Sequence, residues 1–228
     1  GEVTNTELIL TYPYVRSRSR NLVFGAGVRS THSTQHTLGI QTADNRIDLF
    51  SLTALGSWVH DDSATTNTTL VFSSNGKSNP GTRQDAQSAK LDIDINHLRA
   101  ASKNWDLYLR SNWVFSGGTL ADTEKFSLGG PGSVRGYRSS ELRGDSGWVA
   151  TAELRRQFVL GNTAGVYHLF YDWGSVSAKG FTRNDSLRSG GVGVSVFPHK
   201  NLRAKVELAY PSSNRISGDG KRGRAWFT

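Results

Sequence analysis

The 228-residue chain contains no cysteine and no methionine, and only 5 of its residues are proline. The lack of cysteine excludes a disulfide scaffold, a thiolate zinc site and a cysteine nucleophile. No stretch approaches the about 18 uninterrupted apolar residues that a transmembrane helix needs, which excludes a helical membrane protein. The chain opens on GEVTNTELIL, with neither an initiator methionine nor the basic and apolar leader of a signal peptide. We therefore expect a mature chain or a piece of a longer one.

The composition that remains is rich in glycine and aromatic residues and is basic. Glycine occurs 25 times and aromatic residues make up 10% of the chain, which argues against disorder. Lys and Arg number 27 against 19 Asp and Glu, a net charge of +8. The basic residues are spread along the chain rather than clustered with aromatic residues, so the charge does not indicate a nucleic-acid site. A basic lumen or contact with anionic lipopolysaccharide would also explain it, and we favour the lumen.

Apolar and polar residues alternate with a period of two along much of the chain. In KLDIDIN, for example, Leu91, Ile93 and Ile95 alternate with Asp92 and Asp94. A strand sorts such residues onto two faces, whereas a helix would scatter them around its circumference. The same alternation occurs in GWVATAELRRQF (147–158) and NLRAKVELAY (201–210), and no segment has a convincing helical pattern.

Counting the alternating runs predicts about eleven strands and one all-β unit, because no exact repeat and no interdomain linker interrupts the chain. The predicted strands lie near residues 5–14, 20–33, 45–60, 65–74, 86–100, 104–116, 146–158, 164–174, 186–197, 201–211 and 223–228.

Two features favour a transmembrane barrel over a soluble β-sandwich or lectin, which alternation alone leaves open. Many predicted strands reach the about 9–11 residues that a tilted strand needs to cross a bilayer. Charged residues are frequent on the polar face, and aromatic residues fall near strand ends, as in interfacial girdles. Barrels usually close with an even number of strands, so an odd count indicates either a miscount or missing strands.

The longest interruption, residues 117–146, is rich in glycine but also contains apolar residues that a purely solvated loop would not need. Gly129, Gly130 and Gly132 flank Pro131 and predict tight turning. The next four residues, Val134, Arg135, Gly136 and Tyr137, place an arginine between apolar neighbours. This pattern suggests a tip that packs inside the molecule, where the arginine must find a carboxylate because a buried unpaired charge is costly.

The segment FSLGGPGSVRGYRSSELRGDSGWVATAELR resembles the signature region of two-partner secretion transporters, the TpsB family of the outer-membrane assembly-factor superfamily. In that family a VRG[YF] tip on a long extracellular loop folds back into the barrel, and its arginine pairs with the aspartate of an F-x-D-x-G motif. The resemblance assigns these roles to Arg135 and to Asp172, with Phe170 and Gly174 completing the second motif. TYPYVRSRSRNL (11–22) and LRAKVELAYP (202–211) are similar to further family segments.

The resemblance implies an all-β, antiparallel transmembrane β-barrel of sixteen strands, of which residues 1–228 would be the C-terminal portion with about eleven. The first strands and the periplasmic POTRA domains would be absent, and loop 117–146 would fold inward. The implied function is ATP-independent secretion of a large exoprotein, a TpsA-type adhesin, haemolysin or toxin, across the outer membrane of a Gram-negative bacterium. Outer-membrane lipid and lipopolysaccharide would be further partners. An assembly factor of the same superfamily, a passive porin and a soluble lectin-like sandwich remain alternatives.

No other motif predicts chemistry. GDGKRG (218–223) matches G-x-G-x-x-G but lies between two predicted strands, where a hairpin loop is the better interpretation. DIDIN (92–96) lacks the downstream Gly and Glu of an EF-hand. We therefore predict no enzyme, no metal and no cofactor. We expect Arg135 and Asp172 to form an ion pair that is partly solvated, since a sixteen-stranded lumen holds water.

Overall fold

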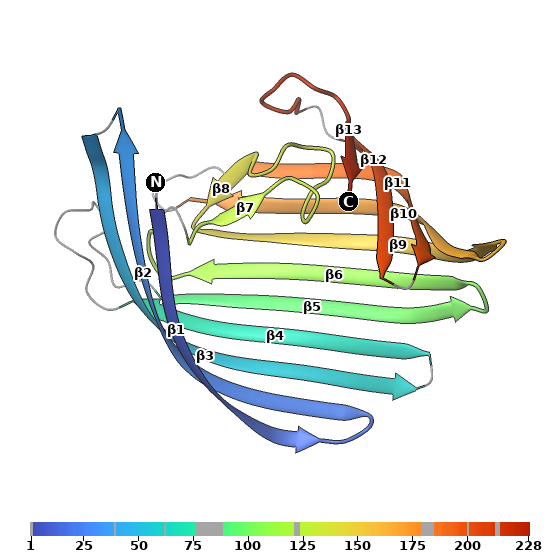
Figure 1. Cartoon of the computed structure of the whole chain (residues 1–228), viewed down its shortest axis with the longest axis horizontal. Coiled ribbons are helices and arrows are strands. Elements are labelled where there is room, and N and C mark those ends of the chain that lie inside the picture. The colour runs from blue at the N-terminus through green and yellow to red at the C-terminus, as the bar shows by residue number, and fades with distance from the viewer. Residues whose placement is uncertain are drawn as a thin grey trace.

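The computed structural model is a single strongly curved antiparallel sheet with a short hairpin on its concave side (Figure 1). It describes residues 2–38, 40–61, 63–75, 89–120, 124–178, 185–199, 201–212 and 215–228. Among these residues no helix is long and apolar enough to cross a membrane. The strands are β1 (Glu2–Arg16), β2 (Arg20–Thr37), β3 (Ile40–Asp61), β4 (Ala64–Asn75), β5 (Ala89–Ser102), β6 (Trp105–Ser116), β7 (Phe126–Leu128), β8 (Leu142–Gly144), β9 (Ser146–Leu160), β10 (Thr163–Ser177), β11 (Asp185–His199), β12 (Leu202–Pro211) and β13 (Arg224–Phe227).

Eleven strands pair in chain order from β1 to β13, and β7 and β8 form a separate two-stranded sheet. The eleven predicted strands are therefore confirmed. The prediction missed β7 and β8, whose three residues each are too short to show a period. β9 begins at Ser146, as the predicted strand 146–158 does. Residues 121–123 of this loop lie outside the described residues.

The two edges of the sheet differ in the length of their connections. At one edge, strands are joined by two or three residues, at 17–19, 62–63, 103–104, 161–162 and 200–201. At the other edge, β2 and β3 are joined by two residues at 38–39, and the remaining connections are longer, at 76–88, 117–145, 178–184 and 212–223. We call these the short-turn edge and the long-loop edge. β1 and β13 are the two outermost strands, so the described sheet is open between them.

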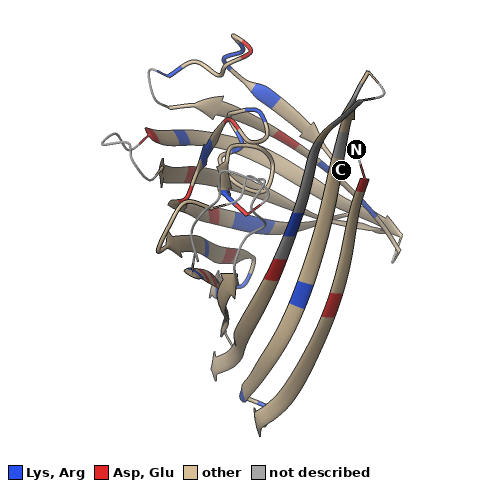
Figure 2. Cartoon of the chain, turned by 90° about the vertical axis from the view of Figure 1, so that its left-hand side faces the viewer, with Lys and Arg blue, Asp and Glu red and all other residues tan. Residues whose placement is uncertain are grey.

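Directly paired residues point to the same face of a sheet, so the registers assign every strand an outer and an inner face. Leu91, Ile93 and Ile95 pair with outward residues of β4 and β6, while Asp92 and Asp94 lie on the concave face. Exposed large apolar side chains recur along the convex face of all the long strands. Figure 2 shows acidic and basic positions interspersed along the strands and in the loop against the sheet. The sheet is thus apolar outside and polar inside, the inverse of a soluble barrel.

The apolar core lies on the concave side, where the long loop packs against the sheet. Leu128, Val134 and Tyr137 of the loop are fully buried. They pack in one cluster with residues of the sheet such as Val149 and Leu187. The inward-packing loop therefore provides the core that a soluble β-sandwich would form between two sheets.

The two faces should report different environments to a probe. In a full-length protein without other cysteines, Ile93→Cys and Asp94→Cys each allow a unique nitroxide label on neighbouring residues of β5. In the membrane-inserted full-length protein, we expect the Ile93 label to be accessible to oxygen and the Asp94 label to a water-soluble relaxation agent. The reverse accessibility pattern would identify a soluble barrel with an apolar interior.

Candidate functional site

The loop between β6 and β9 folds back along the concave face and brings its tip to strands β9 to β13. Tight turning begins at Gly129 and Gly130, whose φ angles of +106° and +102° lie in the region that favours glycine. A side chain at Gly129 would also meet the carbonyl of Arg138 at 2.5 Å. Gly132 differs from the prediction, since its φ is not positive and a Cβ there would meet nothing within 4 Å. Of the three predicted turn glycines, Gly129 and Gly130 are therefore the two whose backbone conformation favours glycine.

Arg135 binds Asp172 of β10 through its side chain and its backbone. Nη2 and Nε donate to the two carboxylate oxygens at 2.7 and 2.9 Å, and the backbone N–H donates to Oδ2 at 3.1 Å. This is the bidentate geometry in which a planar guanidinium matches a carboxylate. The hydroxyls of Thr151 and Ser189 donate to the same carboxylate at 3.0 and 3.4 Å. The structure thus brings together the two residues that the resemblance pairs.

Two further carboxylates share the same guanidinium. Nη1 of Arg135 donates to Glu153 on β9 at 2.8 Å and to Glu207 on β12 at 2.7 Å. Arg155 also binds Glu153, at 2.7 Å, and Lys205 binds Glu207, at 2.8 Å. With the β10 aspartate, three carboxylates face three cations, so the charges balance. We call these six residues the Arg135 cluster.

Aromatic residues hold the arginine from two further directions. The ring of Phe170 lies under the guanidinium, with Cζ 3.4 Å from the ring centroid, which is a cation–π contact. The indole N–H of Trp226 on β13 donates to the carbonyl of Arg135 at 2.8 Å. The loop tip therefore contacts the last strand of the sheet as well as β9, β10 and β12.

The site is dry, which differs from the expected solvated pair. Arg135 is 3% exposed and Asp172 is fully buried, because the loop itself covers them. Burial alone lowers the pKa of Arg135, but its hydrogen bonds to Asp172 and the charges of Asp172 and Glu153 raise it more, so the net pKa lies above the usual arginine value. The guanidinium stays charged at any physiological pH.

Gly136 and Gly174 allow the backbone of the loop and of β10 to approach their neighbours closely. A Cβ at Gly136 would lie 2.6 Å from Cβ of Ser189 and 2.8 Å from the backbone N of Pro211. A Cβ at Gly174 would lie 2.5 Å from the carbonyl oxygen of Trp148. Both motif glycines are thus required by close packing rather than by a positive φ.

Gly136→Ala should therefore loosen the loop tip, whereas Gly132→Ala should leave it unchanged. Overpacking against backbone atoms costs about 1–3 kcal/mol, which corresponds to a rise in loop opening of about fivefold to 160-fold. Hydrogen exchange of a peptide covering residues 129–141 in the full-length protein measures this opening. Equal exchange in both variants would show that the tip is not closely packed against β11 and β12.

Two other contacts attach the loop to the concave side. Glu124 binds Arg29 of β2 at 2.6 Å and Lys90 of β5 at 3.0 Å. Glu141 accepts hydrogen bonds from Ser217 Oγ and from the backbone N–H of Gly218, both at 2.8 Å. Burial raises the pKa of Glu141, but these hydrogen bonds and nearby Arg138 lower it more, so its net pKa lies below the usual value. The loop is thus attached near both ends as well as at its tip.

Sequence reasoning missed Glu153, Glu207 and Trp226 as partners of Arg135. Alternation placed the two glutamates on the polar face of their strands, but it gives no register between strands that are distant in the chain. Trp226 faces Glu207 across β12 and β13, which no sequence spacing indicates. Within the described ranges, no group of three or more His, Asp or Glu side chains is arranged to hold a metal ion.

Comparisons with known proteins support the resemblance. The family model of the haemolysin secretion/activation proteins ShlB/FhaC/HecB matches residues 3–196. No curated protein matches the chain in a sequence comparison. CdiB from Acinetobacter baumannii has a similar structure, with a TM-score of 0.82 and 14% identity over 99% of this chain and 41% of that one.

CdiB from Escherichia coli gives a TM-score of 0.85 and 15% identity over 99% of this chain and 44% of that one. The two solved structures agree with an all-β fold of the outer-membrane barrel type, and the chain spans less than half of the length of each. Because the family model covers most of the chain, the chain belongs to the haemolysin secretion/activation protein family ShlB/FhaC/HecB, the two-partner secretion transporters of the Gram-negative outer membrane.

Proposed function

We propose that residues 1–228 form the C-terminal portion of a larger barrel that moves one large exoprotein from the periplasm to the cell surface. Supporting this, the sheet is apolar on its convex face and polar on its concave face. Along a polar concave wall, the unpaired backbone groups of an extended chain stay hydrated. On a route through lipid they would lose their water. The partner would be an adhesin, haemolysin or toxin of the TpsA type.

In this proposal the loop tip with Val134, Arg135, Gly136 and Tyr137 sets the conformation of the barrel wall. The single observation that carries the proposal is the Arg135 cluster, in which one buried guanidinium links the loop to β9, β10 and β12. With the loop docked, the segment 129–141 occupies the concave side, where an exoprotein would pass. Secretion then requires that the loop stabilise the barrel wall and that the exoprotein pass beside it, either next to the docked loop or after the loop moves aside.

The proposed transport uses no ATP and no enzymatic step. The periplasm contains no ATP, so direction would come from folding of the exoprotein outside the cell. The long-loop edge would face outward and the short-turn edge would face the periplasm. The first barrel strands and the periplasmic domains, which relatives of more than twice this length have room for, would supply recognition of the exoprotein.

A comparison of secreted proteins tests the function. Deleting the full-length gene should remove one large protein from the cell surface and medium and leave it in the periplasm, and complementation should restore it. Unchanged secretion together with reduced amounts of many other outer-membrane barrels would instead identify an assembly factor.

A further inference from the structure

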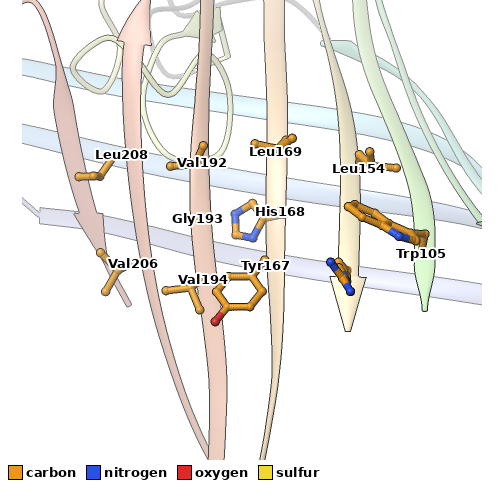
Figure 3. Close-up of a pocket in the computed structure, with 11 residues that line it drawn as sticks. Trp105, Leu154, Tyr167, His168, Leu169, Val192, Gly193, Val194, Val206 and Leu208 are labelled. Atoms are coloured by element: carbon orange, nitrogen blue, oxygen red, sulfur yellow. The ribbon is translucent and has the colours of Figure 1, made fainter. Parts of the chain in front are cut away.

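The convex face of the sheet carries a hollow of about 500 Å³ on the side opposite the loop (Figure 3). Its upper row consists of Leu154, Leu169, Val192 and Leu208, which lie side by side across β9, β10, β11 and β12. Strict register places these four apolar side chains at one level. The row is a shallow apolar surface that fits an acyl chain.

The lower row lies two residues nearer the short-turn edge along each strand and, unlike the upper row, contains a charged residue. Arg156 on β9 is paired in register with Trp105 on β6 and with Tyr167 on β10. Its guanidinium carbon lies 5.4 Å from the centroid of the Trp105 ring. In the part of the chain that the structure describes, no carboxylate forms an ion pair with this exposed arginine. An uncompensated cation thus borders the apolar row on the lipid side of the sheet.

The position of Arg156 along β9 places it at the boundary of the apolar band. Trp148 lies on the same face eight residues away and stacks on Trp113 with a ring separation of 5.4 Å. Eight residues of strand span about 27 Å along the strand, which is about 19–22 Å along the membrane normal at a tilt of about 35–45°, somewhat less than the apolar band of about 25 Å that aromatic girdles border in outer-membrane barrels. Trp148 and Trp105 therefore lie near opposite boundaries of the band, which puts Arg156 near the head-group level of the short-turn edge, where a charge is tolerated.

We infer that this hollow binds one anionic phospholipid. Its phosphate would accept hydrogen bonds from Arg156 between Trp105 and Tyr167, and an acyl chain would lie over the upper row ending at Leu208. A guanidinium binds a phosphate through paired N–H donors, and amphipathic aromatic rings favour the head-group level. The choice of a phospholipid over lipopolysaccharide rests on the proposed function, which places the short-turn edge in the periplasmic leaflet.

Native mass spectrometry of the purified full-length protein tests the inference without any exoprotein. With phosphatidylglycerol and phosphatidylethanolamine supplied in equal amounts, we expect one retained phosphatidylglycerol and about a fivefold preference for it, the effect of one basic residue near a charged surface. Arg156→Gln should reduce the preference to nearly equal binding. A preference that persists in Arg156→Gln would overturn the inference.

Two matched variants separate a defined site from general attraction. Arg99 lies on the outer face of β5 at the same edge but outside the hollow, so Arg99→Gln should keep the preference. Val194→Phe fills the hollow without changing charge and should lower retention of both lipids. Equal loss of preference in Arg99→Gln, or stronger retention of lipid A than of phosphatidylglycerol, would refute a phospholipid site. Heat-modifiable mobility on gels verifies that each variant is folded.

Discussion

Arg135→Ala in the full-length transporter is expected to reduce secretion of the exoprotein at least tenfold while the barrel stays folded. The substitution leaves Asp172, Glu153 and Glu207 buried, with Arg155, Lys205 and the His168 imidazole as the remaining basic partners. Breaking a buried pair by removing one partner costs about 3–5 kcal/mol, equivalent to a loss of roughly a hundredfold or more in the docked loop population. The backbone ladder of the sheet does not depend on this contact. Immunoblots of the medium measure secretion, and heat-modifiable mobility measures folding.

Asp172→Ala should also impair secretion, but less severely. Arg135 would keep Glu153 and Glu207 as partners through Nη1, while losing the bidentate contact and the backbone hydrogen bond. The double variant should be little worse than Arg135→Ala alone, because residues in one network act as a unit. Additive defects would show that the two residues act separately.

Arg138→Ala is the matched control for loss of a loop arginine. Arg138 lies three residues from Arg135, its side chain is 52% exposed, and it pairs with Glu141 at 3.0 Å. Because the arginine end of the pair is exposed and Glu141 keeps its hydrogen bonds to Ser217 and Gly218, the loss should cost about 1 kcal/mol or less, and secretion should stay close to that of the wild type. Normal secretion by Arg135→Ala, or an equal defect in Arg138→Ala, would contradict a special role for the buried cluster.

The strands could be predicted because each long strand carries its own two-residue period. Leu91, Ile93 and Ile95 show their face without any knowledge of the neighbouring strand. β7 and β8 could not be predicted, because three residues are too few to show an alternation of apolar and polar residues. The two strands form because the loop packs on the sheet. Gly132 was expected to help the turn on composition alone, but the positive φ angles fall on Gly129 and Gly130.

The candidate site could be predicted only as far as its motifs reach. The resemblance pairs Arg135 with Asp172, 37 positions apart, whereas Glu207 lies 72 positions from Arg135. Glu207 reaches the guanidinium because β10, β11 and β12 pair in a register that sets Glu207 beside Gly193 and Gly193 beside His168. A missing side chain at Gly193 leaves room there, since a Cβ would lie 2.8 Å from Cγ of Glu207. Such coincidences of register and curvature have no local sequence signal.

The isolated 228-residue chain is expected not to form uniform, long-lived channels in a planar bilayer. β1 has 15 residues and β13 has four, and both are outermost strands of the described sheet. In lipid each unpaired backbone group costs several kcal/mol. The backbone N–H and C=O groups of the outermost strands of an open eleven-stranded sheet therefore need other hydrogen-bond partners. Pairing of edges between copies is the available route for exposed strands. We therefore expect heterogeneous conductance and oligomers on gels.

The full-length protein serves as the control, because the additional strands that we propose would pair with both edges. It should give one reproducible conductance level under the same conditions. Uniform and stable channels from the isolated chain would mean that β1 and β13 close on one another despite their unequal lengths. That outcome would replace the sixteen-stranded barrel by a smaller one, and the loop tip would then fill most of the lumen rather than one side of its wall.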